Sequence, residues 1–151
     1  HPTLVIAGNH DCNLNNPDRL DVLSPILDMM DDDNLFYLKD SGVYKIGDTA
    51  IGVFSILDDP ESYVSGFDIT DESVTTKIAV YHGAVKRSMT DIGYVVMGGD
   101  IDLPTFNGYD IVMLGDIHKY QVLQEYQVEH RYIPEHKIDE YKLKGWYVSD
   151  E

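Results

Sequence analysis

Short runs of apolar residues, bounded by glycine, asparagine or aspartate, recur along most of the chain. Runs of roughly four to eight such residues are typical of buried β-strands, and a membrane-spanning helix needs about 20. The pattern predicts strands at residues 3–8, 35–38, 42–46, 50–56, 77–81 and 109–114. Gly47, Asp48 and Thr49 stand between the third and fourth of these strands and predict a tight hairpin.

Helical spacing is confined to one stretch. Leucine, isoleucine and methionine recur at steps of three and four between residues 20 and 30, which predicts a helix that Pro25 breaks or restarts. Residues 57–76 and 84–108 have the composition of loops, with one helical turn near residues 104–106. Further strands are expected at 120–126 and 141–148. The predicted fold class is α/β, with one domain over residues 1–126 and an unassigned segment over residues 127–151.

The charge balance restricts the partners. The 151 residues include 27 acidic and 11 basic side chains, for a net charge of −16. Such a chain repels polyphosphates over most of its surface, so binding a phosphate requires a local change of sign, for example by divalent cations. Cys12 is the single cysteine, which excludes an internal disulfide and a cysteine-rich zinc site. An intracellular, cytoplasmic location fits this composition, and we expect no membrane partner.

Polar side chains follow three of the predicted strands. Asn9, His10 and Asp11 follow the first, His82 ends the strand at 77–81, and Asp116 and His118 follow the last. Ligands of open α/β sheets bind outside the carboxyl ends of the strands. Taken singly, each residue also fits a turn, a helix cap or a hydrogen-bonded histidine, but their coincidence favours a metal site. Imidazole with amide and carboxylate oxygens suits Mn²⁺, Fe or Zn²⁺ better than Ca²⁺.

At these positions the chain resembles the calcineurin-like metallophosphoesterases. Residues 5–11, Val-Ile-Ala-Gly-Asn-His-Asp, match the GNHD motif and the strand before it. Tyr81-His82-Gly83 matches the later histidine motif, and residues 114–118, Leu-Gly-Asp-Ile-His, resemble the closing GHxH motif. The resemblance covers residues 2–126. It is nearest to the DNA-repair and phage-type nucleases related to the nuclease subunit of the double-strand-break repair complex.

The resemblance implies a β-sandwich flanked by helices that binds two divalent ions, Mn²⁺ in the first place, with Mg²⁺, Fe or Zn²⁺ as alternatives. Asn9 and His82 would ligate one ion and His118 the other. Asp116 stands where the family has a histidine ligand, and a carboxylate there favours Mn²⁺ or Mg²⁺.

The resemblance also implies catalytic roles. His10 would face the scissile phosphate as general acid or as a stabiliser of the transition state, and Asp11 would orient His10. A hydroxide activated by the two metal ions would attack phosphorus.

The family has a DxH motif and a GD motif before the GNHD strand, and neither precedes Thr3 here. We therefore expect a partial domain whose first strands are missing, with little or no activity by itself. Missing strands leave open sheet edges and exposed apolar surface, so we also expect homodimers or aggregates.

The leading functional hypothesis is a metal-dependent phosphoesterase that hydrolyses phosphodiester bonds, a nuclease directed at DNA, with an ATPase as partner. One alternative is a small-molecule or nucleotide phosphatase of the same superfamily, which the acidic surface favours. Another is an inactive remnant that binds a partner protein, which the Asp116 replacement favours.

Overall fold

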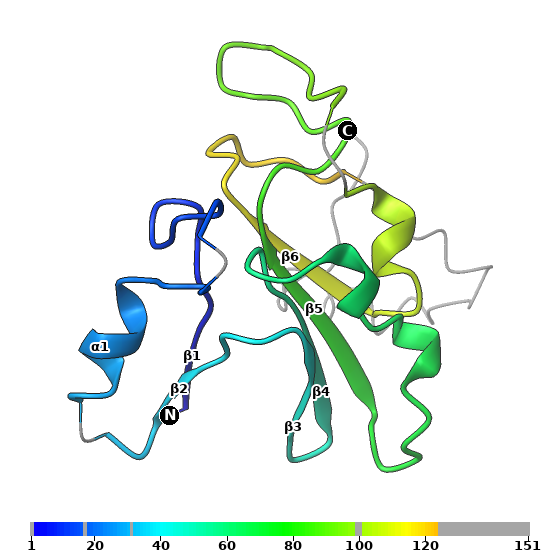
Figure 1. Ribbon diagram of the computed structural model, residues 1–151. Coiled ribbons are helices and arrows are strands. Elements are labelled where there is room, and N and C mark those ends of the chain that lie inside the picture. The colour runs from blue at the N-terminus through cyan, green and yellow to red at the C-terminus, as the bar shows by residue number, and fades with distance from the viewer. Residues whose placement is uncertain (1, 17, 31, 99–100, 124–151) are drawn as a thin grey trace.

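Two β-sheets form the framework of the protein, a mixed α/β fold with few helical residues (Figure 1). The computed structural model describes residues 2–16, 18–30, 32–98 and 101–123. In the smaller sheet, β1 (Thr3–Val5) pairs in parallel with β2 (Leu35–Tyr37). The larger sheet has the order β3-β4-β5-β6, with strands β3 (Gly42–Ile46), β4 (Thr49–Phe54), β5 (Thr76–His82) and β6 (Ile111–Gly115).

The larger sheet is mostly parallel. The first two of its strands form an antiparallel hairpin, in which Ile46 pairs with Thr49 across the turn. β5 pairs in parallel with β4 on one side and with β6 on the other, and the last pair of this register is His82 with Gly115. β5 is therefore central, and its carboxyl end lies beside that of β6.

Each strand expected within residues 3–114 is present, and the predicted hairpin is confirmed. The expected helical turn is also present as the 3-10 helix η3 (Leu103–Phe106). The loop expected at residues 57–76 contains two more 3-10 helices, η1 (Pro60–Ser62) and η2 (Gly66–Asp68).

Two expectations were wrong. The helix α1 (Leu23–Leu27) is only five residues long and is not broken at Pro25, which is its third residue. A backbone N–H in the first turn has no acceptor within the helix, so a proline there costs no hydrogen bond. Residues 120–123 form no strand, and the remainder of that expected strand lies outside the described residues, as does the one at 141–148.

One face of the larger sheet carries the main core. Its buried residues lie on β4, β5 and the segments that cover them: Phe54, Ala79, Tyr81, Val85, Ile101, Phe106 and Tyr109. Phe54 is the centre, with its ring edge-on to Tyr63 and Phe106 at centroid distances of 5.0 Å each. The loops between β4 and β5 and between β5 and β6 therefore pack as a layer on this face.

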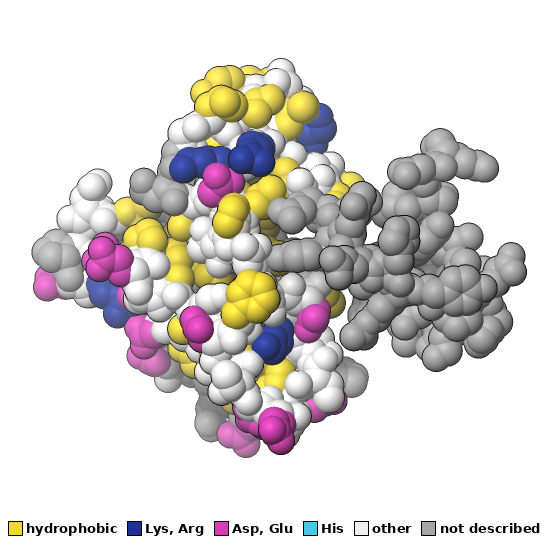
Figure 2. Space-filling model, turned by 90° about the vertical axis from the view of Figure 1, so that its right-hand side faces the viewer, with side chains coloured by type: hydrophobic (Ala, Val, Ile, Leu, Met, Phe, Trp, Pro, Cys, Tyr) yellow, Lys and Arg dark blue, Asp and Glu magenta, His cyan; other side chains and the backbone are white. Residues whose placement is uncertain are grey.

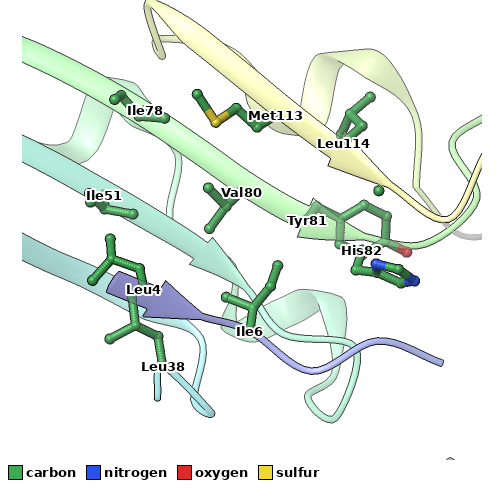
Figure 3. Close-up of a pocket in the computed structure, with 11 residues that line it drawn as sticks. Leu4, Ile6, Leu38, Ile51, Ile78, Val80, Tyr81, His82, Met113 and Leu114 are labelled. Atoms are coloured by element: carbon green, nitrogen blue, oxygen red, sulfur yellow. The ribbon is translucent and has the colours of Figure 1, made fainter. Parts of the chain in front are cut away.

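The opposite face is covered in part by the smaller sheet. Leu4, Ile6 and Leu38 pack towards Ile51 and Val53 of β4. Next to this contact an apolar groove of about 430 Å³ lies between the two sheets and ends at His82 (Figure 3). The β6 side of this face is open, and the side chain of Met113 there is 56% exposed. Among the described residues no strand pairs with the second edge of β1.

No helix in the described part of the chain has the length and apolar character needed to cross a membrane.

We expect the open groove to drive self-association. An exposed apolar face beside an unpaired strand edge favours contacts between copies. Sedimentation velocity over a concentration series should therefore show larger species as concentration rises, and Met113→Gln should reduce them. Met29→Gln is the matched control, because Met29 is exposed but lies away from the groove. Equal association of the two variants would contradict this expectation.

Candidate functional site

The carboxyl ends of β1, β5 and β6 meet and bring three of the predicted ligands together. The side-chain amide of Asn9 donates to Oδ1 of Asp116 at 3.0 Å. Nε2 of His82 lies 4.0 Å from the same oxygen. Asn9 belongs to the loop after β1, His82 ends β5 and Asp116 follows β6. Residues separated by more than 100 positions thus form one cluster, as the strand-end pattern predicts.

Two glycines make room for the imidazole of His82. A Cβ atom on Gly8 would lie 2.9 Å from Nε2 of His82, and one on Gly115 would lie 2.6 Å from Nδ1. Both distances are shorter than side chains tolerate, so the ring occupies a slot between two backbones that only glycine allows. The glycines of the two motifs therefore have a direct steric function, which is to position His82 between the sheets.

Asp116 has an unusual backbone conformation. Its φ of +82° lies in the left-handed region, which costs a non-glycine residue free energy. In this conformation the carboxylate of Asp116 points towards Asn9 and His82. A strained residue with a polar side chain in a cluster of potential ligands is typical of functional sites.

The loop after β1 is stabilised by backbone contacts. The carboxylate of Asp11 accepts a hydrogen bond from the Gly8 N–H at 2.8 Å, and the Asp11 carbonyl accepts one from the Val22 N–H at 2.8 Å. His10 lies between Gly8 and Asp11 in the sequence, and it is exposed to solvent. Its predicted role as general acid, and that of Asp11 in orienting it, remain predictions.

An ion pair between Asp21 and Lys39 lies next to the loop that follows β1. Asp21 has a fully buried carboxylate that lies 2.7 Å from Nζ of Lys39 and accepts hydrogen bonds from the backbone and hydroxyl of Ser24. Burial by itself would raise the pKa of Asp21, but these hydrogen bonds and the lysine charge outweigh it, and the pKa is well below its usual range. Asp21 also forms a β-bridge with Cys12. This pair was not predicted, because the acid lies alone in a helical pattern and its lysine is distant in sequence.

Cys12 has the properties of a structural side chain. Its thiol donates to the Gly8 carbonyl at 3.4 Å. Burial, followed by the negative charges of Asp11 and Asp21, raises the pKa of the thiol. A thiol with a raised pKa is protonated at neutral pH and is a weak nucleophile.

His118 is exposed and lines a shallow hollow of about 230 Å³. Asp116 and Ile117 line the same hollow, together with Thr90, Asp91 and Ile92 from the long loop between β5 and β6. The structure therefore connects the ligand cluster to a loop that sequence patterns did not associate with the site.

The cluster contains side chains of the types that bind divalent cations. Asn9, His82 and Asp116 offer an amide oxygen, an imidazole nitrogen and a carboxylate, which is a donor set that Mn²⁺ accepts. Within the described part of the chain no three histidine, cysteine or acidic side chains are grouped closely enough to hold a metal ion. The two metal ions, and the role of His118 as a ligand, therefore stay predictions.

The comparisons give one relative. The chain is 42% identical, over an alignment of 132 residues that covers 82% of it, to the uncharacterized protein R555 of Acanthamoeba polyphaga mimivirus. The matched segment is about 10% of that protein, so the chain spans a small part of the curated relative that it matches. No protein-family profile and no solved structure matches the chain.

The glycine slot gives a direct prediction. Gly8→Ala or Gly115→Ala should displace the His82 ring, since either new methyl group would overlap it. The measurement is the position of the His82 imidazole resonances in ¹⁵N–¹H spectra, assigned with His82→Gln. Gly98→Ala is the control, because a Cβ there meets no atom within 4 Å. Unchanged His82 resonances in both alanine variants would show that the slot is not as close as described.

Asp21→Asn should reduce the free energy of unfolding at pH 7 by about 2–3 kcal/mol, because Lys39 loses its buried partner. Asp40→Asn is the control, since its exposed carboxylate shares Arg19 with Asp58 and should contribute less than about 1 kcal/mol. The pKa of Asp21 is lowered in the folded state, so its contribution is complete above the unfolded value of about 3.9 and declines as pH falls further. Urea unfolding at pH 7 and pH 3 should show a smaller difference between wild type and variant at pH 3.

Proposed function

We propose that this chain carries part of the active site of a metal-dependent phosphodiesterase with a calcineurin-like fold, and that its substrate is a nucleic acid, DNA in the first place. The observation that carries the proposal is the convergence of Asn9, His82 and Asp116 at the ends of three strands. A divalent ion held there would supply charge neutralisation on a phosphate oxygen and would acidify a bound water molecule.

The chain's own residues provide orientation and proton transfer. The His82 imidazole lies between the backbones of Gly8 and Gly115, which leave room for it beside Asp116. The carboxylate of Asp116 fixes the amide of Asn9, which orients a second donor. His10, exposed on the neighbouring loop, is free to approach a phosphoester bound at the cluster and to protonate the leaving oxygen.

The donor set is incomplete, and the proposal includes its completion. The groove between the sheets ends at His82, and among the described residues no strand pairs with the second edge of β1. Strands that extend the smaller sheet from that edge would cover Met113 and would end next to the cluster. The resemblance to the metallophosphoesterases implies such a strand pair with its own metal ligands.

A nucleotide or small-molecule phosphatase is the second candidate. The net charge of −16 favours it, because a long polyanion meets repulsion over most of the surface. Salt distinguishes the two functions, since nucleic-acid binding weakens steeply with ionic strength and hydrolysis of a small ester does not.

The proposal is tested by Mn²⁺ binding and hydrolysis together. Calorimetry should show about one ion for each chain, and His82→Ala should weaken binding at least about 10-fold. His118→Ala is the matched control, because His118 lies outside the cluster and its loss should leave this ion in place.

With bis(p-nitrophenyl) phosphate, the wild-type chain should show a low Mn²⁺-dependent rate that EDTA abolishes and that His82→Ala and His10→Ala reduce. A wild-type rate no higher than that of His82→Ala would reject the proposed activity for this chain. Mn²⁺ binding that is unaffected by His82→Ala would reject the site itself, which would leave the partner-binding remnant as the better interpretation.

A further inference from the structure

A hairpin that the proposed chemistry does not use projects next to the candidate site. Residues 86–98 leave the end of β5 and form the loop at the top of Figure 1. Met89 bridges Val95 in antiparallel fashion, and the backbone N–H groups of Thr90 and Val96 donate to the carbonyls of Tyr94 and Ser88, each at 2.8 Å. The projection is thus an ordered β-hairpin.

The hairpin is fixed to the segment that carries His118. The side chain of Gln121 accepts a hydrogen bond from the Met89 N–H and donates one to the Met89 carbonyl, each at 2.9 Å. Nζ of Lys119 lies 3.1 Å from the sulfur of Met89. Asp91 and Ile92 at the turn line the same hollow as Asp116 and His118. The tip and the candidate site are therefore parts of one continuous surface.

The tip of this hairpin is apolar and exposed. Ile92 is 92% exposed and Tyr94 is 63% exposed, and we call these two residues the tip pair. Met97 on the returning strand is also exposed. Figure 2 shows apolar side chains gathered at this end of the molecule, with Lys and Arg side chains directly beneath them. Exposed apolar groups on an ordered projection are typical of a binding element.

Basic residues gather at the base of the same hairpin. Lys86 and Arg87 begin it, and Lys119 contacts it from the segment after β6; we call these three residues the basic collar. The other described lysines and arginines are bound within the protein, as ion pairs of Arg19, Lys39 and Lys45 or, for Lys77, on the carbonyls of Gly66 and Ile69. In the collar, only Arg87 has an acidic partner among the described residues, Asp102 at 4.0 Å, and its side chain is 71% exposed. The collar is thus the one place where a strongly acidic chain presents cations to a ligand within its described part.

We propose that this hairpin is a nucleic-acid-binding element: the collar binds backbone phosphates, and the tip pair packs against unpaired or terminal bases. The proposal rests on the phosphodiesterase function inferred above, and it adds the class of substrate, a strand end or single-stranded segment. Bases stack on aromatic side chains in a sequence-tolerant way, and apolar side chains can separate base steps. Bases held at the tip would place the adjoining phosphates over the hollow that leads to Asp116.

A lipid surface is the less favoured ligand. Asp91 stands directly before Ile92 of the tip pair, and a carboxylate is costly to bury in a bilayer. Insertion of the tip into a membrane would also close the hollow that contains His118.

Binding is measured by fluorescence anisotropy on the full chain, in EDTA, with a labelled DNA duplex that has a single-stranded extension and with the same duplex blunt-ended. Tyr94→Ser should weaken binding to the extended duplex about 10-fold, and Tyr94→Phe should bind like wild type, because stacking needs the ring and not the hydroxyl. Phe67→Ser is the matched control, since Phe67 is an aromatic residue that is at least as exposed as Tyr94 but lies on η2.

The collar is tested by salt dependence. Substitution of all three collar residues by glutamine should lower the slope of log Kd against log salt by about two, because each phosphate contact releases counterions. Lys45→Gln, which removes a cation remote from the hairpin, should leave the slope nearly unchanged.

The outcomes separate this inference from the proposed function. Wild-type affinity in Tyr94→Ser, no DNA binding by the wild-type chain, or binding to anionic vesicles that Tyr94→Ser alone abolishes would each overturn the hairpin proposal. Loss of DNA binding in the hairpin variants without any Mn²⁺-dependent hydrolysis by wild type would retain the hairpin and reject the phosphodiesterase. The opposite result is Mn²⁺-dependent hydrolysis of the small ester together with DNA binding that neither Tyr94→Ser nor the collar substitutions change. It would retain the phosphodiesterase and reject the hairpin proposal.

Discussion

The His82 imidazole lies between the backbones of Gly8 and Gly115, at the point where the ends of the two sheets meet. β5 and β6 are neighbours in one sheet, whereas β1 belongs to the other, and their shared contact at this end is the His82 ring together with the hydrogen bond from Asn9 to Asp116. A larger residue at either glycine would displace the His82 ring and so disturb the cluster. The chemical site therefore lies at one end of the junction between the sheets, next to the apolar contact of Leu4, Ile6 and Leu38 with β4.

The distribution of charge follows a related constraint. The sequence has 27 acidic and 11 basic side chains, and among the described residues Arg19, Lys39 and Lys45 form close ion pairs with carboxylates. Asp21 shows the need for a partner most clearly, since its carboxylate is fully buried and depends on Lys39. Arg19 similarly joins Asp40, which follows β2, and Asp58, which follows β4. In the described part of the chain, the cations without a close ion pair or carbonyl partner are those of the basic collar, at the base of the hairpin beside the site.

The strands and the cluster were predictable from sequence because both depend on local signals. Apolar runs that end in glycine mark buried strands, and parallel strands place their carboxyl ends at one edge, which brings His82 and Asp116 together. The short helix was misjudged because Pro25 is harmless in a first turn. The hairpin at 86–98 could not be predicted in this way. Gln121 pairs with Met89 across 32 positions, and the exposed Ile92 and Tyr94 have the same local pattern as core residues.

As far as the structure describes the chain, the apolar groove is incompletely covered, and the donor cluster has too few ligands for two metal ions. In the described part of the chain the side chain of Met113 on β6 is exposed at the groove, and the cluster offers three donors where a two-metal site requires more. The groove and the cluster share His82. Strands added in parallel to the second edge of β1 would end beside His82, because parallel neighbours in a sheet end at the same edge. They would cover Met113 and bring further side chains to the cluster in the same step. Folding and metal binding would then be coupled, since the residues that complete the core would also complete the site.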